Sequence, residues 1–241
     1  MTPELLSILV PVFNESRTVA SVIDRLMTVD LPVAREIILV NDGSSDGTRD
    51  ILDAFPVQGG AVTILHVEQN AGKGAAIRLG LRHARGTIIA IQDADLELDP
   101  SQLAALVAPI VAGDTNVVYG SRFLAGRPEA PWLTIVANRT LTLLTNLLFG
   151  AHITDMETCY KIMRTDVARS LGLESDRFDI EPEITAKLLL AGQRIQELPV
   201  TFKPRRRAEG KKIGWRDGFR ALRVLALYRV GAWRRSAPAR S

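Results

Sequence analysis

The sequence predicts an α/β protein in which a mainly parallel β-sheet is flanked by helices. Short apolar runs typical of buried strands recur along the first half of the chain. A polar or glycine-containing loop and then a helical period separate each run from the next. Strands that alternate with helices in this way form parallel sheets covered on both faces.

The first half contains five expected strands, at residues 6–12, 36–41, 62–67, 87–92 and 117–121. Apolar residues at helical spacing follow at 19–27 and 103–111, and Asp99-Pro100-Ser101 is a plausible start for the second of these helices. Ligands of parallel sheets bind at the carboxyl ends of the strands, so the loops after these strands are expected to hold the site.

The second half has a different pattern. Residues 132–149 read as a helix that is too polar to span a membrane, 159–164 and 194–202 as strands, and 181–191 as a helix. A final helix is expected from about 215 to 233. No linker separates these parts, so we expect one domain over 1–202, completed by a basic loop and an amphipathic helix over 203–241.

Composition narrows the class of protein. The 241 residues are 46% hydrophobic and 24% charged, which excludes a disordered, collagen-like or disulfide-stapled chain. The single cysteine, Cys159, cannot pair within the chain, and this favours the reducing cytoplasm. No apolar run reaches the roughly 18 residues of a membrane span, and no signal peptide is evident, so a soluble or peripheral protein is expected.

Positive charge is concentrated at the C-terminal end. Residues 203–241 carry 13 Lys or Arg against two acidic residues, whereas 1–202 carry 17 basic and 25 acidic residues. Such a block can be a solvated tail. Nucleic acid is a weaker candidate for the partner, because no aromatic residues alternate with the arginines and no recognition-helix motif is present. Membrane lipid or a phosphorylated substrate fits better.

Three acidic residues follow the expected strand 87–92. Asp93, Asp95 and Glu97 lie at i, i+2 and i+4, and such neighbours repel unless a cation neutralises them. Mg²⁺ or Mn²⁺ binds one or two carboxylates and completes its shell with water and phosphate oxygens. Taken alone, the pattern also fits solvated acids in a loop.

Two other loops follow strands or open a helix. In residues 41–48, Asp42 could accept a hydrogen bond from a nucleobase while Asp46 and Thr48 shape the loop; an ordinary strand-to-helix turn is the alternative. Residues 70–74 open a helix, where backbone N–H groups and Lys73 favour an anion. The spacing of an ATP-binding P-loop is absent.

Several segments in register resemble the family 2 glycosyltransferases, whose fold is the Rossmann-like GT-A fold. The first five are residues 8–15, 40–48, 72–74, 93–95 and 120–122. Residues 155–161, 178–183 and 209–218 make the chain more similar to the dolichol-phosphate mannose synthase and polyprenyl-phosphate glucosyltransferase branch. The resemblance covers nearly the whole chain.

The resemblance implies roles for individual residues. The nucleoside would contact Pro11, Phe13, Glu15, Val40 and Asp42. Asp93 and Ala94 would lie along the sugar nucleotide, Asp95 and Glu97, together with Asp93, would bind the metal, and Arg122, Arg205 and Lys211 would bind phosphates. The chain departs from its relatives at Glu97, where mannose synthases often have Gln, and at Asn41, where Asp is common.

The implied reaction is attack of an acceptor oxygen on the anomeric carbon of a nucleotide sugar, with inversion and departure of the nucleoside diphosphate. A lipid monophosphate acceptor has a second pKa of about 6 and is largely dianionic at neutral pH, so no strong base is needed. Asp155 is the candidate for positioning the acceptor or assisting the reaction; the alternative is that it only starts a loop.

The final helix has an amphipathic pattern. Phe219, Leu222, Leu225 and Ala226 recur on one side, with arginines around them and tryptophans at both ends. This pattern fits a helix in the membrane interface, and it also fits a helix packed on its own domain. We expect peripheral association with the cytoplasmic face of the membrane, directly or through a membrane-protein partner.

Together these features predict a metal-dependent, inverting hexosyltransferase that uses a GDP or UDP sugar and a polyprenyl or dolichyl phosphate. A soluble or protein acceptor is the first alternative. An inactive scaffold that binds nucleotide or membrane is the second, and the acidic set Asp93, Asp95 and Glu97 argues against it.

Overall fold

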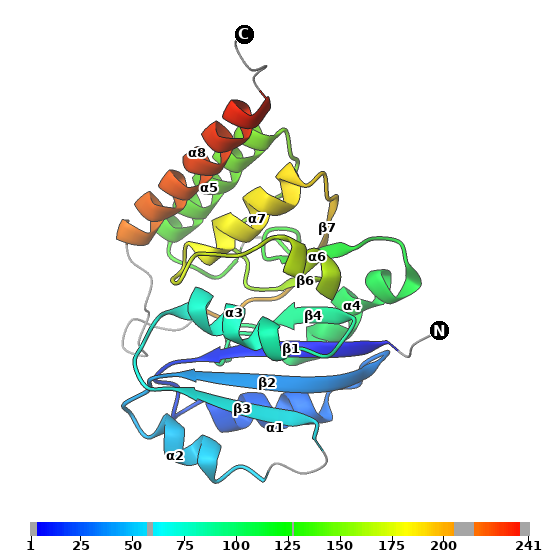
Figure 1. The fold of residues 1–241 in the computed structure, drawn as a ribbon, viewed down its shortest axis with the longest axis vertical. Coiled ribbons are helices and arrows are strands. Elements are labelled where there is room, and N and C mark those ends of the chain that lie inside the picture. Colours follow the sequence, from blue (N-terminus) through cyan, green and yellow to red (C-terminus); the bar gives the residue numbers. More distant parts are fainter. Residues whose placement is uncertain (1–3, 57–59, 127, 205–214, 237–241) are drawn as a thin grey trace.

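A seven-stranded mixed sheet forms the centre of the protein, with the strand order β3-β2-β1-β4-β6-β5-β7. The structure is a computed structural model that describes residues 4–56, 60–126, 128–204 and 215–236 (Figure 1). Its elements are, in chain order, β1 (Leu5–Val12), α1 (Val19–Thr28), β2 (Ala34–Asp42), α2 (Thr48–Asp53), β3 (Val62–Val67), α3 (Lys73–His83), β4 (Ile88–Ile91), η1 (Pro100–Gln102), α4 (Leu103–Ala112), β5 (Val117–Ser121), α5 (Trp132–Phe149), β6 (Lys161–Arg164), α6 (Thr165–Ser170), α7 (Ile180–Leu190), β7 (Ile195–Pro199) and α8 (Trp215–Ser236).

The pairing of the strands confirms the predicted mainly parallel sheet. β1 pairs in parallel with β2 and β4, β2 with β3, and β5 with β7. β6 is the exception, because it runs antiparallel between β4 and β5. The carboxyl ends of β1, β2 and β4 therefore meet at one edge of the sheet, where the sequence predicts the site.

The predicted elements are present, with ends that differ by a few residues. β7 is shorter than the predicted strand 194–202 and ends at Pro199, although the Val200 N–H still donates to the Ser121 carbonyl oxygen at 3.0 Å. The predicted helix start at Asp99 is confirmed: its side chain accepts a hydrogen bond from the Ser101 N–H at 3.1 Å, and η1 leads directly into α4.

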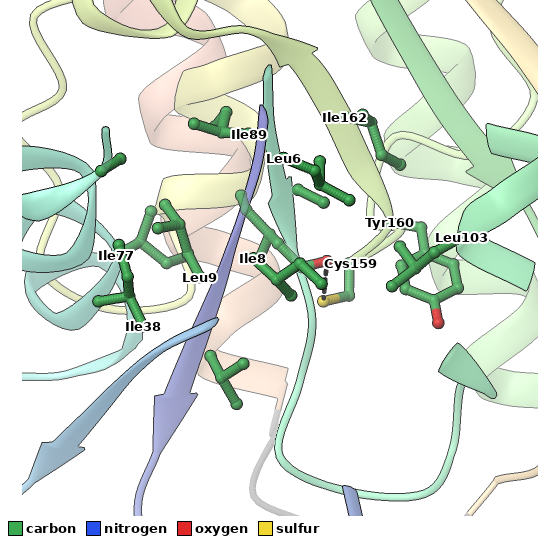
Figure 2. Close-up of a cluster of buried hydrophobic side chains, with 14 of the residues drawn as sticks. Leu6, Ile8, Leu9, Ile38, Ile77, Ile89, Leu103, Cys159, Tyr160 and Ile162 are labelled. Atoms are coloured by element: carbon green, nitrogen blue, oxygen red, sulfur yellow. Dashed lines mark hydrogen bonds between the residues drawn. The ribbon is translucent and has the colours of Figure 1, made fainter. Parts of the chain in front are cut away.

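Apolar side chains pack on both faces of the sheet. Figure 2 shows Leu9 and Ile38 on the side of Ile77 from α3, whereas Ile8 points to the opposite side. All four side chains are almost completely buried. The Cys159 thiol lies in the same core and donates to the Ile91 carbonyl oxygen at 3.8 Å. Burial on both faces explains the continuous apolar strands that the sequence shows.

A second, smaller cluster joins three helices at the other end of the molecule. α5 and α8 lie side by side next to α7 (Figure 1). The buried residues of this cluster are Leu141 of α5, Ala186 of α7, Ala221 and Leu225 of α8, and Ile153 and Met156 of the loop after α5. One face of α8 is therefore packed against its own domain, as the second interpretation of the final helix predicts.

Candidate active site

A cavity of about 410 Å³ lies at the carboxyl edge of the sheet. Most residues predicted for the site line it: Pro11, Phe13, Glu15, Asp42, Lys73, Asp93, Ala94, Asp95, Glu97 and Arg122. Val40 and Asp155 do not, because both are buried behind the wall of the cavity. Arg205 and Lys211 fall outside the described residues. The topology thus gathers side chains from the ends of β1, β2, β4 and β5 around one space.

Asp42, at the end of β2, organises the loop that leads to α3. Its Oδ1 accepts the Ala71 N–H at 2.9 Å, and its Oδ2 accepts the Gly72 N–H at 2.7 Å and the Asn70 side-chain N–H at 2.8 Å. These bonds use three of the roughly four acceptor positions of a carboxylate. None of these bonds uses the remaining acceptor position on Oδ1.

Asp46 and Thr48 tie the loop after β2 to the loop after β1. Thr48 Oγ1 accepts the Glu15 N–H at 2.9 Å, and Asp46 Oδ1 accepts the Thr48 hydroxyl at 2.5 Å. The Ser16 N–H donates to the other oxygen of Asp46 at 3.1 Å. Burial acts to raise the pKa of Asp46, but the hydrogen bonds from Thr48 and Ser16 outweigh it and lower the pKa to about 2. The predicted shaping role of these two residues is therefore confirmed.

Lys73 links the acidic loop to the helix α7. Its Nζ lies 2.8 Å from Asp93 Oδ1 and 2.9 Å from Glu181 Oε1. Burial alone would lower the pKa of Lys73, yet the carboxylates of Asp93 and Glu181 raise it, so the ammonium stays charged. Lys161 then approaches the other oxygen of Glu181 at 2.5 Å. Lys73 thus holds Asp93 in place as well as lining the cavity.

Asp93, Asp95 and Glu97 supply carboxylate oxygens, the type of ligand that a hard divalent cation prefers. All three line the cavity, and Asp95 is nearly buried, with its Oδ1 accepting the Glu97 N–H at 3.1 Å. In the part of the chain that the structure describes, no three acidic, histidine or cysteine side chains are grouped closely enough to form a metal centre by themselves. Mg²⁺ commonly takes only one or two carboxylates and obtains its other ligands from water and substrate phosphates. A cation at this loop would therefore need further ligands from water or from a bound phosphate.

Arg122 is fixed in the cavity by Asp155. Nε and one terminal nitrogen of Arg122 lie 2.7 Å from Oδ2 and Oδ1 of Asp155, and the Arg122 N–H donates to Oδ2 at 3.0 Å. Asp155 is itself held by Glu197 of β7, which accepts the Asp155 N–H at 3.0 Å. Arg122 also lies over the Phe202 ring, 5.2 Å from its centre. Asp155 therefore reaches a ligand only through Arg122.

Further residues of the cavity were not predicted as site residues. They are Asn70, Phe123, Glu157, Arg177, Phe178, Phe202 and Arg220, among others. Glu157 and Phe178 lie in segments that resemble the glycosyltransferase branch, and this was the available signal. Burial raises the pKa of Glu157 to about 7, since the nearby charges of Lys161 and Arg122 only partly offset it.

Apolar side chains are exposed on α5 and α8. Of the twelve large hydrophobic residues that are exposed among the described residues, nine belong to these two helices. They are Trp132, Leu133, Val136, Leu143 and Leu147 of α5, and Phe219, Leu222, Leu227 and Val230 of α8. We call this set the apolar helix surface. Arg139, Arg220, Arg223 and Arg229 of the same helices are exposed as well.

None of the helices that the structure describes is long and apolar enough to cross a bilayer.

Comparison with protein families gives one match over most of the chain. Residues 7–172 match the model described as glycosyl transferase family 2. Among curated proteins, an undecaprenyl-phosphate mannosyltransferase from Micrococcus luteus is 29% identical over 233 residues, which are 93% of this chain and 94% of that protein. A dolichyl-phosphate beta-glucosyltransferase from Trichomonas vaginalis is 27% identical over 95% of this chain and 75% of its own length.

Solved structures share the fold. A crystal structure of glucosyl-3-phosphoglycerate synthase from Mycobacterium tuberculosis, in complex with Mn²⁺, UDP and glucosyl-3-phosphoglycerate, superposes with a TM-score of 0.73. It covers 95% of this chain and 81% of that chain at 19% sequence identity. The mostly parallel sheet with its flanking helices is therefore the GT-A fold.

Proposed function

The chain belongs to glycosyl transferase family 2 and is a glycosyltransferase, and from that premise we propose that it moves a hexose from a nucleoside-diphosphate sugar to a polyprenyl phosphate. The observation that carries the proposal is that Asp42, Asp93, Asp95 and Arg122 line the same cavity at one edge of the sheet. Such a cavity offers an acceptor for a base, carboxylates for a cation and a guanidinium for a phosphate. Two curated relatives named for polyprenyl- or dolichyl-phosphate substrates support the acceptor.

In this proposal the nucleoside lies between the loops after β1 and β2. Pro11, Phe13 and Glu15 form one wall, and the remaining acceptor position of Asp42 faces the base. The hydrogen bonds from Thr48 to Asp46 and from the Glu15 N–H to Thr48 keep the two loops at a fixed distance. This pre-organisation lowers the entropy cost of binding.

The diphosphate would lie beside the acidic loop. Asp93, Asp95 and Glu97 would hold Mg²⁺ or Mn²⁺ there, and such an ion, when bound, stabilises the negative charge that grows on the departing diphosphate. Lys73 keeps Asp93 oriented and Ala94 lies along the sugar nucleotide, while Val40 supports Asp42 from within β2. The cited M. tuberculosis neighbour, which contains Mn²⁺ and UDP, supports the use of a divalent cation together with a nucleoside diphosphate.

Arg122 would bind the acceptor phosphate. Its guanidinium is restrained by Asp155 and Phe202, so little side-chain entropy is lost when a phosphate binds. Asp155 is then a positioning residue. The acceptor needs no strong base, because a phosphate monoester with a second pKa of about 6 is largely dianionic at neutral pH. Arg205 and Lys211 would add further phosphate contacts, and the transfer would invert the anomeric carbon.

The apolar helix surface would bring the enzyme to its lipid substrate. Exposed apolar side chains flanked by arginines fit the boundary between lipid headgroups and acyl chains. Arg220 belongs both to α8 and to the lining of the cavity, so this surface adjoins the proposed acceptor site. We therefore propose peripheral binding to the cytoplasmic face of a membrane through residues 203–241 and α5, either directly or with a membrane-protein partner.

A transfer assay tests the proposal. The purified chain is incubated with Mn²⁺, a polyprenyl phosphate in detergent and radiolabelled GDP-mannose or UDP-glucose. We expect label to enter the organic phase only when enzyme, lipid phosphate and donor are all present. If the label stays in the aqueous phase with every donor while a soluble acceptor becomes glycosylated, the lipid acceptor is wrong and the soluble molecule is the acceptor.

A further inference from the structure

Glu157 is a cavity residue to which the proposed reaction gives no role. It lies in the loop between α5 and β6 and lines the cavity together with Asp93 and Arg122. The residue is partly accessible, but its Oε1 atom is buried and accepts no hydrogen bond within the described part of the chain. A buried acceptor that lacks a donor is costly, so a ligand that supplies one gains affinity.

The nearby cations are already bound to other partners. Lys161 Nζ donates to the carbonyl oxygens of Met156 and Thr158 and to Glu181 Oε2, which uses all three of its N–H groups. Arg122 directs two of its N–H groups at Asp155. Neither cation forms an ion pair with Glu157 in the structure as described. The described part of the chain therefore supplies no donor to this atom, and a ligand in the cavity could supply one.

The surrounding charge indicates which part of the ligand supplies it. Glu181 and Asp155 act on Glu157 as negative charges and oppose its ionisation. A phosphate placed against Glu157 would add another negative charge at short range, and a dianionic phosphate has no proton to donate. A sugar hydroxyl is neutral and donates a hydrogen bond. Because the proposed function places the nucleoside, with its ribose hydroxyls, between the loops after β1 and β2, the hexose is the part of a nucleotide sugar that suits this position.

We infer that Glu157 accepts a hydrogen bond from a hydroxyl of the donor hexose and so takes part in selecting the sugar. This inference rests on the proposed function. A site built to bond a hydroxyl rejects the analogue that lacks it, because the polar group of the protein is then left unpaired. Glu157 thereby differs from Asp93 and Asp95, whose proposed ligands are a cation and a diphosphate.

Calorimetric binding with matched ligands tests this role. The full chain is titrated with UDP, GDP, UDP-glucose and GDP-mannose in the presence of Mn²⁺. We expect Glu157→Ala to weaken the binding of the nucleotide sugar that the wild type binds by about 10- to 100-fold, the range for a hydrogen bond to a charged group. The affinity for the free nucleoside diphosphate should be unchanged. Glu157→Gln keeps an acceptor oxygen and should retain part of the affinity.

Deoxy analogues of the donor identify the hydroxyl. The wild type should lose affinity for one deoxy-hexose nucleotide, whereas Glu157→Ala should bind that analogue and the parent sugar equally. Glu68→Gln is the matched control, because Glu68 is exposed and does not line the cavity. Should Glu157→Ala fail to fold, Glu157→Gln replaces it, and the affinity that this variant loses on removal of the hydroxyl should be smaller than the affinity that the wild type loses.

The outcomes separate the two proposals. Equal weakening of nucleoside diphosphate and nucleotide sugar would make Glu157 structural, and unchanged affinity for both would show that it does not contact the sugar; either result overturns the inference but leaves the proposed function. A wild-type protein that binds none of the four ligands overturns the proposed function and the inference with it.

Discussion

Arg122 and Asp155 form a two-point ion pair in which both carboxylate oxygens lie 2.7 Å from guanidinium nitrogens. Asp155 is completely buried, whereas Arg122 reaches the cavity with 13% of its side chain exposed. The acid therefore determines where the guanidinium lies, and the guanidinium is the group that a ligand meets. Asp155, which the sequence predicts as a site residue, thus lies behind Arg122 and does not line the cavity.

Replacing Asp155 should affect both stability and acceptor binding. Asp155→Asn leaves the Arg122 guanidinium without its counter-charge, and breaking a buried pair of this kind costs about 3–5 kcal/mol. We expect a lower free energy of unfolding in urea and a KM for the lipid phosphate that rises more than kcat falls. A loss of stability with unchanged KM would show that the pair is only structural.

Gly72 should resist substitution because the backbone of another loop is close to it. Its φ is +109°, and an added Cβ would lie 2.5 Å from the Asp176 carbonyl oxygen. Gly47 has a similar φ of +87° but nothing within 4 Å, so Gly47→Ala controls for backbone strain. We expect Gly72→Ala to lower the free energy of unfolding by about 1–3 kcal/mol more than Gly47→Ala, as overpacking does. Equal losses in thermal melts would contradict the steric argument.

The sequence predicted the position of the acidic loop because that depends on local order. A buried strand followed by Asp93, Asp95 and Glu97 can place these residues only at a sheet edge. The same reasoning missed Glu181 and Glu157, since their environment is set by residues far away in the chain, such as Lys73. The antiparallel direction of β6 also depends on tertiary pairing with β4 and β5, and no local signal reveals it.

The raised pKa of Glu157 predicts a pH dependence of stability. Burial, with Glu181 and Asp155 opposing and Lys161 and Arg122 favouring ionisation, raises this pKa from 4.5 to about 7. Between these two values the folded protein keeps a proton that the unfolded chain has released, so stability falls as pH rises through this window. In urea unfolding, the free energy of unfolding of the wild type should decrease between pH 5 and pH 8. This decrease should exceed the decrease for Glu157→Gln by roughly 1–3 kcal/mol. Equal decreases would mean that Glu157 ionises normally.

The apolar helix surface predicts salt-sensitive binding to anionic vesicles. Leu147 is 72% exposed on α5, and a charge there would oppose insertion into the headgroup region. We expect Leu147→Asp to reduce flotation with phosphatidylglycerol vesicles several-fold. NaCl at about 0.5 M should also reduce flotation, because the salt screens the charge of the arginines. Met27→Asp, at an exposed apolar residue of α1, is the control and should float like the wild type. Flotation that changes neither with salt nor with Leu147→Asp would contradict a role for this surface in membrane binding.

The most direct test of the account is a crystal structure of the protein with Mn²⁺ and the nucleoside diphosphate that binds it. We predict anomalous manganese density between the carboxylates of Asp93 and Asp95 and the diphosphate oxygens, with the base against Asp42 and Pro11. Manganese or nucleotide bound away from this edge of the sheet, with the carboxylates of Asp93 and Asp95 contacting neither, would contradict it.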